Sequence, residues 1–118
     1  MTDPYDELRA LYPWLPRPSC GPGWHAVLED LCERLAGGLP PSVLRAPVVA
    51  AVGEAQGRLR VETGGAGRFA GRVEAFVREA VAASEGTCQQ CGAPGHRADQ
   101  GGWWATLCER HEAQGMWL

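Results

Sequence analysis

The chain has 118 residues, which is enough for one small domain. Its formal net charge is −3, and Arg supplies all 11 positive charges. Because non-specific nucleic-acid binding depends on clustered positive charge, this balance disfavours nucleic acid as a partner. The chain opens without a basic segment followed by an apolar one, and no apolar run approaches the ~18 residues of a membrane helix. We therefore expect a cytoplasmic protein with no signal peptide and no membrane contact.

Residues 1–22 are predicted to form a Pro-rich N-terminal arm. Asp3 is placed to cap a short helix in the stretch YDELRALY, with Pro4 at its first position. The stretch PWLPRPSCGPG that follows contains four prolines, so we expect it to be extended or turning. Trp14 and Leu15 are the side chains expected to dock the arm, either on the body of the protein or on a partner.

Residues 23–86 are predicted to form an α-β-β-α body. Apolar residues recur at helical spacing over 24–36 and again over 69–85, and glycine follows each run. Between these helices, residues 46–55 and 57–63 have the composition and alternation of strands. We expect the two strands to pair antiparallel around the Gln-Gly turn that separates them.

The C-terminal residues 87–118 hold three of the five cysteines and two of the three histidines. Two pairs stand out, Cys88-x2-Cys91 and Cys108-x2-His111, with sixteen residues between them. Ligands three positions apart can reach one ion from a single turn, and two such pairs complete a tetrahedral zinc site. In a reducing cytoplasm such cysteines indicate metal binding rather than disulfides. The sequence therefore predicts one structural Zn²⁺ per chain on these four side chains.

The residues around these pairs predict a treble-clef zinc finger, in which a turn, a hairpin and a helix share one ion. Gly92 allows the turn of the first pair to bend back. Gly101-Gly102 before WWATL indicates a hairpin or loop that delivers a strand to Cys108, and CERHEAQG indicates one or two helical turns. The fold expected overall is α+β: helix, two-stranded antiparallel sheet, helix, and a zinc-binding unit packed on the body in a single compact domain.

The sequence also allows a second set of metal ligands. The stretch CQQCGAPGHRADQG resembles the CCHC zinc knuckle of retroviral nucleocapsid proteins, whose pattern is C-x2-C-x4-H-x4-C. Cys88, Cys91 and His96 match it, but Gly101 stands where the fourth ligand is required. His96 is therefore an alternative to His111 as the fourth ligand.

The donor set predicts a structural rather than a catalytic metal. A catalytic zinc keeps one position open for water, whereas four Cys and His donors close the site. The paired H-x-E and P-C-x-x-C elements of zinc deaminases are absent, and the chain has no Asn for nuclease chemistry of the HNH type. We expect no catalytic residues and no enzyme activity; a metal-dependent hydrolase or nuclease is the third hypothesis.

The leading functional hypothesis is a non-enzymatic, zinc-stabilised protein that acts by protein–protein interaction, as an accessory factor or inhibitor with an unknown partner. Exposed tryptophans are its expected contact residues, namely Trp14, Trp103, Trp104 and Trp117. Of the adjacent pair Trp103-Trp104, one side chain is expected to pack inward, over the zinc unit or the second long helix, and the other to be exposed. The rival hypothesis is nucleic-acid binding through the zinc module, with a basic cluster of Arg58, Arg60, Arg68 and Arg72. Cys20 and Cys32 are expected to be turn and core thiols.

Three stretches resemble a family of small uncharacterised phage and prophage proteins: SCGPGWHAVLEDLCERL, VVAAVGEAQGRLRVETGG and TCQQCGAPGHRADQGGWWATLCERH. The match covers residues 19–112, and its most specific parts are Gly23-Trp24 and the cysteine segment with Gly102-Trp103. The chain departs from the family at Pro22, where an acid is usual, and at Ala55-Gln56, where Lys-Phe is typical. The resemblance implies a compact α/β domain with zinc in a phage-related setting, and no assigned activity.

Overall fold

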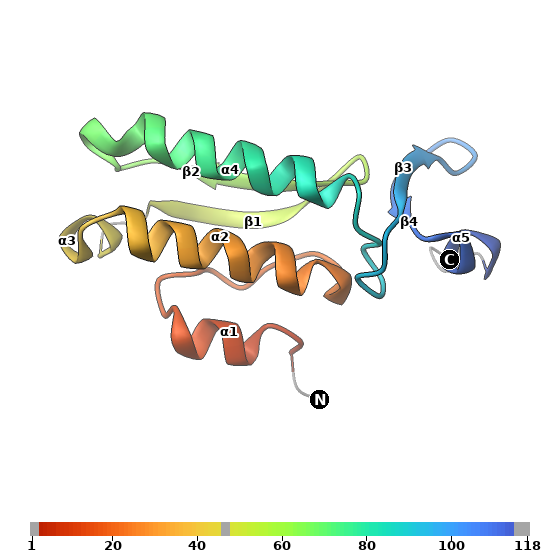
Figure 1. The fold of residues 1–118 in the computed structure, drawn as a ribbon, viewed down its shortest axis with the longest axis horizontal. Helices are drawn as coiled ribbons and strands as arrows, with labels where there is room; N and C mark the ends of the chain where they lie inside the picture. Colours follow the sequence, from red (N-terminus) through yellow and green to blue (C-terminus); the bar gives the residue numbers. More distant parts are fainter. Residues whose placement is uncertain (1–2, 46–47, 115–118) are drawn as a thin grey trace.

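The computed structural model describes residues 3–45 and 48–114, which form an α+β fold as expected. The helices and strands lie in the chain order α1 (Asp6–Leu11), α2 (His25–Gly38), α3 (Pro41–Leu44), β1 (Val49–Ala55), β2 (Arg58–Thr63), α4 (Ala70–Ser84), β3 (His96–Asp99), β4 (Trp104–Leu107) and α5 (Glu109–Gln114). Single 3-10 turns, Pro22–Trp24 and Gly67–Phe69, lead into α2 and α4. Figure 1 shows α2 and α4 side by side in front of β1 and β2, with β3, β4 and α5 at one end of the long axis.

The N-terminal segment is part of the core rather than a free arm. The short helix α1 begins at Asp6 with Tyr5 as its N-cap, so the prediction that Asp3 caps a helix starting at Pro4 is wrong. The Asp3 carboxylate instead accepts a hydrogen bond from the Tyr5 N–H at 2.8 Å, before the helix begins. Further along, the Ser19 N–H donates to the Val52 carbonyl of β1 at 2.9 Å, which fixes the Pro-rich stretch beside the sheet. The segment supplies three side chains that are each only 1% exposed, namely Tyr5, Leu8 and Leu15.

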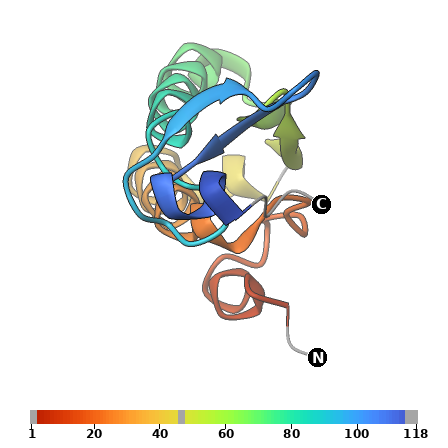
Figure 2. The same cartoon turned by 90° about the vertical axis from the view of Figure 1, so that its right-hand side faces the viewer.

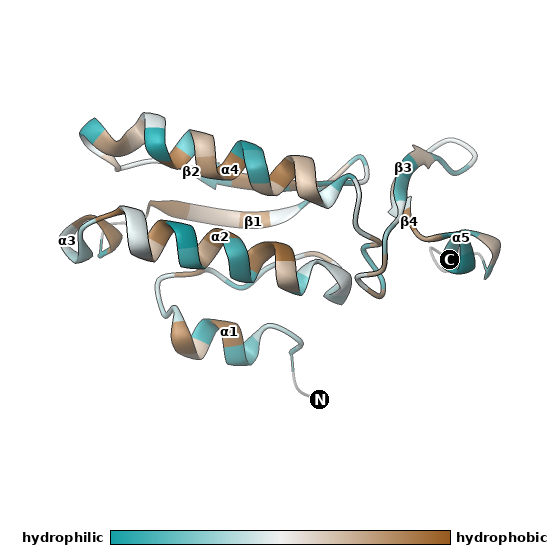
Figure 3. Ribbon diagram, viewed as in Figure 1, coloured by the Kyte–Doolittle hydropathy of each residue, from teal (hydrophilic) through white to brown (hydrophobic). Residues whose placement is uncertain are grey.

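Helices α2 and α4 cover one face of the β1–β2 sheet (Figures 1 and 2), and the apolar spacing seen in the sequence explains this. Figure 3 shows that both helices carry hydrophobic and hydrophilic residues, as amphipathic helices do. The buried side chains between these layers include Leu28, Leu31, Leu35, Val52, Leu59 and Val73.

The first long helix ends later than the sequence predicts. Gly37 and Gly38 lie inside α2, and the chain leaves the helix only at Leu39. The neighbouring helix explains the difference, because Arg72 of α4 donates from Nη1 to the Gly38 carbonyl at 2.6 Å. A Cβ on Gly38 would lie 2.9 Å from the Phe76 ring, so glycine here serves the close packing of α2 on α4.

The predicted strand pair is confirmed, including the position of its turn. β1 and β2 pair antiparallel with Ala55 opposite Arg58. Gln56 and Gly57 form the turn with φ values of 53° and 80°. Two positive φ values in a two-residue turn match the right-handed twist of a hairpin, and glycine adopts such a conformation without strain.

Candidate metal centre

The four predicted ligands lie together in the C-terminal unit. Cys88 and Cys91 come from the turn after α4, Cys108 from the end of β4, and His111 from α5. Their donor atoms, three Sγ atoms and an imidazole nitrogen, all lie within 4.8 Å of one another. The prediction that the pairs Cys88-x2-Cys91 and Cys108-x2-His111 converge on one point is therefore confirmed.

The distances fit a tetrahedral metal. With metal–sulfur bonds of about 2.3 Å, two sulfurs of a tetrahedron lie about 3.8 Å apart, and a sulfur and a nitrogen about 3.6 Å apart. The Sγ atoms of Cys91 and Cys108 are 3.8 Å apart. His111 Nδ1 lies 3.4 Å from Cys88 Sγ and 3.3 Å from Cys108 Sγ. These separations also identify Nδ1 as the imidazole atom that faces the cluster.

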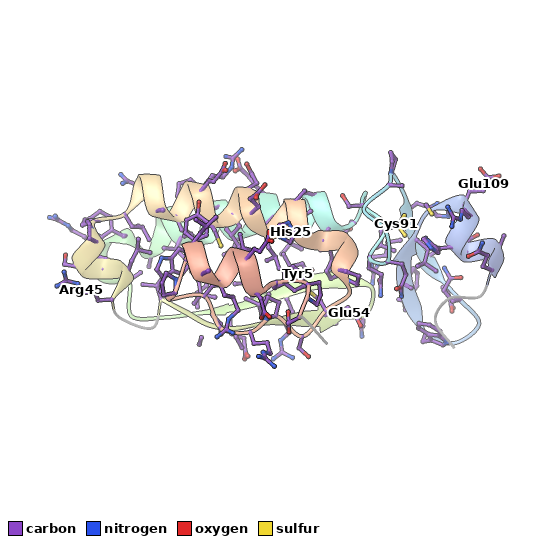
Figure 4. All side chains as sticks on the ribbon, turned by 90° about the horizontal axis from the view of Figure 1, so that it is seen from below. Tyr5, His25, Arg45, Glu54, Cys91 and Glu109 are labelled. Carbon is purple, nitrogen blue, oxygen red and sulfur yellow. The ribbon has the colours of Figure 1, made fainter. Side chains whose placement is uncertain are left out.

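The first cysteine pair is shaped by a tight turn. The Cys88 N–H donates to the Ala93 carbonyl at 2.8 Å, and the Gly92 N–H donates back to the Cys88 carbonyl at 2.9 Å. Gly92 has a φ of +83°, as the turn prediction required. Cys91 lies at the outside of this turn, and Figure 4 shows it between the body and α5.

The surroundings of Cys88 favour its thiolate. Burial by itself raises the pKa of this thiol, but backbone N–H groups of Cys108, Gln90 and Cys91 and the His111 side chain outweigh it and lower the pKa to about 6. The pKa of Cys91 is instead raised: the Ala93 N–H lowers it, but burial and the Cys88 and Cys108 thiols raise it more. The negative charge on neighbouring sulfurs thus opposes ionisation of all three thiols of the cluster. A bound divalent cation would offset the repulsion between the thiolates.

The second pair sits at the start of α5. Cys108 immediately precedes the helix, and the Glu112 N–H donates to the Cys108 carbonyl at 2.9 Å. The His111 N–H points to Cys108 Sγ at 3.4 Å. Both side chains are only 8% exposed. The first turn of the helix therefore fixes the thiol and the imidazole on the same side.

His96, the alternative fourth ligand, lies outside the cluster. It belongs to β3, where its partner in register is Leu107. Its side chain is 65% exposed, and its Nε2 lies 3.3 Å from Glu112 Oε2 on α5. The structure brings His111, and not His96, to the three cysteines.

The cysteine turn docks on the start of α2 through backbone contacts that were not predicted from the sequence. The Gly23 N–H donates to the Gln89 carbonyl, and Trp24 Nε1 donates to the Thr87 carbonyl, both at 2.9 Å. A Cβ on Gly23 would lie 2.0 Å from the Cys88 carbonyl oxygen, and one on Gly21 would lie 2.2 Å from that of Gln89. The Cys-Gly-x-Gly-Trp stretch was the available signal, because two glycines before a buried Trp indicate close backbone contact.

The β3–β4 hairpin, which the sequence predicted as a hairpin or loop, docks on the turn of the first sheet. Thr106 donates its hydroxyl to the Gly57 carbonyl, and Arg97 Nε donates to the Gln56 carbonyl at 2.7 Å. Gly57 lies so close to β4 that a Cβ would be 2.8 Å from the Ala105 backbone. The C-terminal unit is therefore attached to the body at two separate places.

The predicted contact tryptophans lie at different sites. Trp103 and Trp104 are 41% and 42% exposed, so the expectation that one of them packs inward is wrong. The Arg97 guanidinium covers the Trp104 ring at 4.4 Å. Trp14 is half-buried and packs against Tyr12, with ring centroids 5.7 Å apart. Trp117 lies outside the described residues.

The four arginines of the predicted basic cluster each have a local partner. Arg58 lies 3.7 Å from Glu85, and Arg60 lies 3.3 Å from Glu62. Both Arg68 and Arg72 lie over the Phe69 ring, at 5.1 and 5.5 Å from its centroid. Acidic neighbours reduce the positive potential that a phosphate backbone requires.

The two remaining cysteines lie away from the cluster. Cys32 is fully buried in α2, and burial raises its pKa to about 12. Cys20 is partly buried, with its Sγ 3.5 Å from the Tyr5 hydroxyl, and burial raises its pKa as well. Core packing accounts for Cys32, as expected.

Comparison with known proteins identified no relative. No protein-family model matches the chain, and neither the curated proteins nor the solved structures contain a significant match. Among the helices of residues 3–45 and 48–114, none is both long enough and apolar enough to cross a bilayer.

Proposed function

We propose that Cys88, Cys91, Cys108 and His111 hold one structural zinc ion, and that the C-terminal unit is a zinc finger of the treble-clef type. The observation that carries this proposal is the convergence of four donor atoms within 4.8 Å, at separations that suit a tetrahedral ion. Three thiolates with one imidazole form a donor set that selects zinc over the hard cations, which prefer oxygen ligands.

The proposed role of the ion is to hold a small unit together. Four protein donors fill a tetrahedral zinc and leave no position for a reacting water, so we propose that the protein is not an enzyme. The ion would connect the cysteine turn, the end of β4 and the first turn of α5, which share few buried apolar side chains.

The proposed activity is binding to another protein, in the cytoplasm and in a phage-related setting. Trp103 and Trp104 expose large apolar surfaces on the β3–β4 hairpin, and Arg97 lies over one of them. Trp and Arg dominate the binding energy of many protein interfaces. The hairpin is a firm support for such a surface, because Thr106 and Arg97 tie it to the β1–β2 turn.

Cobalt substitution tests the metal proposal. Full-length protein loaded with Co²⁺ should give the intense visible absorption of a tetrahedral ion together with thiolate charge-transfer bands. Cys108→Ser should weaken the charge-transfer bands, whereas Cys20→Ser, outside the cluster, should leave them unchanged. A weak six-coordinate spectrum, or no binding, would contradict the closed four-donor site.

Affinity capture at low and high salt tests the interaction proposal. A protein partner held by apolar contacts should persist as salt rises and should be lost with Trp104→Ala. Leu11→Ala is the matched control, because Leu11 is another exposed apolar side chain, 71% exposed, on the distant helix α1. Capture of nucleic acid that is released steeply by salt would favour the rival function instead.

A further inference from the structure

The four donors of the metal centre differ in their access to solvent. Cys88 is fully buried, and Cys108 and His111 are each 8% exposed, whereas Cys91 is exposed. A cleft of roughly 590 Å³ opens beside Cys91. Its lining comes from the cysteine turn, the end of β4 and α5, and includes Cys91, Ala93, Pro94, Cys108, Arg110 and Ala113.

Two thiols share this cleft and lie in contact. Cys91 and Cys108 both line it, and their Sγ atoms are 3.8 Å apart. Cys88 also neighbours Cys91, but it is fully buried and does not line the cleft, because backbone N–H groups and the His111 ring surround its sulfur. A small solute that enters the cleft therefore meets Cys91 first, and any group formed on that sulfur lies against Cys108.

We propose that Cys91 and Cys108 form an oxidative modification site that reacts with peroxides and releases the metal. In the first step the Cys91 sulfur attacks one peroxide oxygen; the O–O bond breaks, an S–O bond forms, and hydroxide leaves. In the second step Cys108 attacks the Cys91 sulfur; an S–S bond forms, the S–O bond breaks, and the second hydroxide leaves. Two thiolates are oxidised, one peroxide is reduced, and two protons from solvent convert both hydroxides to water.

The proposal rests on the proposed zinc site, and its consequence is a change in metal affinity. A disulfide between Cys91 and Cys108 removes two of the four donors and leaves only Cys88 and His111. Two donors hold zinc far more weakly than four, so the ion is released into solution. A dithiol reductant reverses the disulfide and restores the site, which makes the modification reversible.

Zinc release under hydrogen peroxide tests the proposal on the full-length protein. Zinc is first counted per chain, then peroxide is added, and released metal is followed with a chromogenic chelator. Peptide mapping without reductant identifies the disulfide. We expect a Cys91–Cys108 disulfide that forms in step with zinc release, and recovery of zinc binding after dithiothreitol and fresh Zn²⁺.

Several outcomes would overturn the proposal. A first disulfide through Cys88, Cys20 or Cys32, or zinc that stays bound while peroxide is consumed, contradicts the assignment. A chain that carries no zinc before peroxide contradicts the proposed function itself, so the two failures are distinguishable.

A variant of the cleft wall tests whether access controls the reaction. Ala113→Leu narrows the cleft without touching a donor, and should slow zinc release about three-fold or more, because susceptibility follows exposure. Gln114→Leu is the matched control: it adds an apolar residue at the next position of α5, outside the cleft lining, and should leave the rate unchanged. Equal rates for both variants would show that the cleft is not the route of attack.

Discussion

The body and the C-terminal unit are held together by different physical means. The body and the N-terminal segment packed on it, with α1, α2, α4 and the β1–β2 sheet, bury a continuous apolar core that includes Tyr5, Trp24, Leu31 and Leu59. In the C-terminal unit, the separate buried cluster consists of Cys88, Ala105, Leu107 and Cys108, two of which are members of the donor set. A unit this small buries too little apolar surface to fold by the hydrophobic effect alone.

The chain therefore joins a self-sufficient core to a unit whose folding, with the proposed zinc site, would depend on a bound ion. The two parts are nevertheless joined by backbone contacts, at Gly23 against Cys88 and at Gly57 against Ala105. Side chains at these glycines would force the surfaces apart. Disturbance of one part should therefore reach the other through these two junctions.

Removal of the metal should have the largest effect. Chelation should abolish amide-exchange protection in β3, β4 and α5, while α2 and the β1–β2 sheet keep most of theirs. The expected loss is on the order of 10 kcal/mol of binding free energy, as for structural zinc in small domains. Hydrogen exchange followed by mass spectrometry measures this directly, and equal protection of the C-terminal unit with and without metal would contradict the comparison.

Gly23→Ala should separate the two parts. Its Cβ would lie 2.0 Å from the Cys88 carbonyl oxygen, so the cysteine turn must move away from α2. We expect a loss of about 3 kcal/mol of unfolding free energy, together with weaker zinc binding. Chemical denaturation and zinc competition measure the two effects.

Gly37→Ala is the matched control for Gly23→Ala. Nothing lies within 4 Å of the position where its Cβ would be, and the residue lies inside α2. The substitution should stabilise the protein by about 0.5–1 kcal/mol, because Ala loses less conformational entropy than Gly in a helix. If both variants behaved alike, the junction at Gly23 would have no energetic role.

Ser84→Ala tests a polar contact on which the body depends. The Ser84 hydroxyl is buried at the end of α4, where it accepts from the Leu59 N–H at 3.0 Å and donates to the Val81 carbonyl at 2.6 Å. Without it the Leu59 N–H has no acceptor, and we expect a loss of about 1–3 kcal/mol. Ser42→Ala, at an exposed position of α3, should change stability by less than about 0.5 kcal/mol in the same urea titration.

The pKa of Cys32 predicts a smaller effect that is confined to alkaline pH. Burial raises the pKa of this thiol to about 12 in the folded body, so it keeps its proton while the unfolded chain loses it. Stability is therefore complete below the ordinary thiol pKa and declines above it, by up to about 1.4 kcal/mol per pH unit. Cys32→Ala should flatten the decline between pH 9 and 11 relative to the parent protein. Identical slopes would contradict a protonated core thiol.

The sequence predicted those features that depend on local spacing. The Cys88 and Cys108 motifs each bring two donors to one turn, and Gln56-Gly57 specifies a hairpin turn by its own conformation. These are short-range properties, so a single sequence is sufficient to recognise them.

Features that depend on long-range packing were not predictable in the same way. Leu15 was expected to dock either on the body or on a partner, and only the folded structure shows that it is buried against the body. Trp103 precedes β4 instead of lying within it, so the alternation of a strand did not apply to the pair Trp103-Trp104. The helix continues through Gly38, whose carbonyl accepts a hydrogen bond from Arg72, a residue distant in sequence.

The zinc content of three proteins purified without chelator tests the four-donor site most directly: the parent chain, His111→Ala and His96→Ala. The two histidines differ in position, since His111 Nδ1 faces Cys88 and Cys108 while His96 lies 3.3 Å from Glu112. We expect one zinc per chain in the parent and in His96→Ala, and a strong loss in His111→Ala. Full zinc in His111→Ala with loss in His96→Ala, or a folded parent chain without any metal, would contradict the four-donor site.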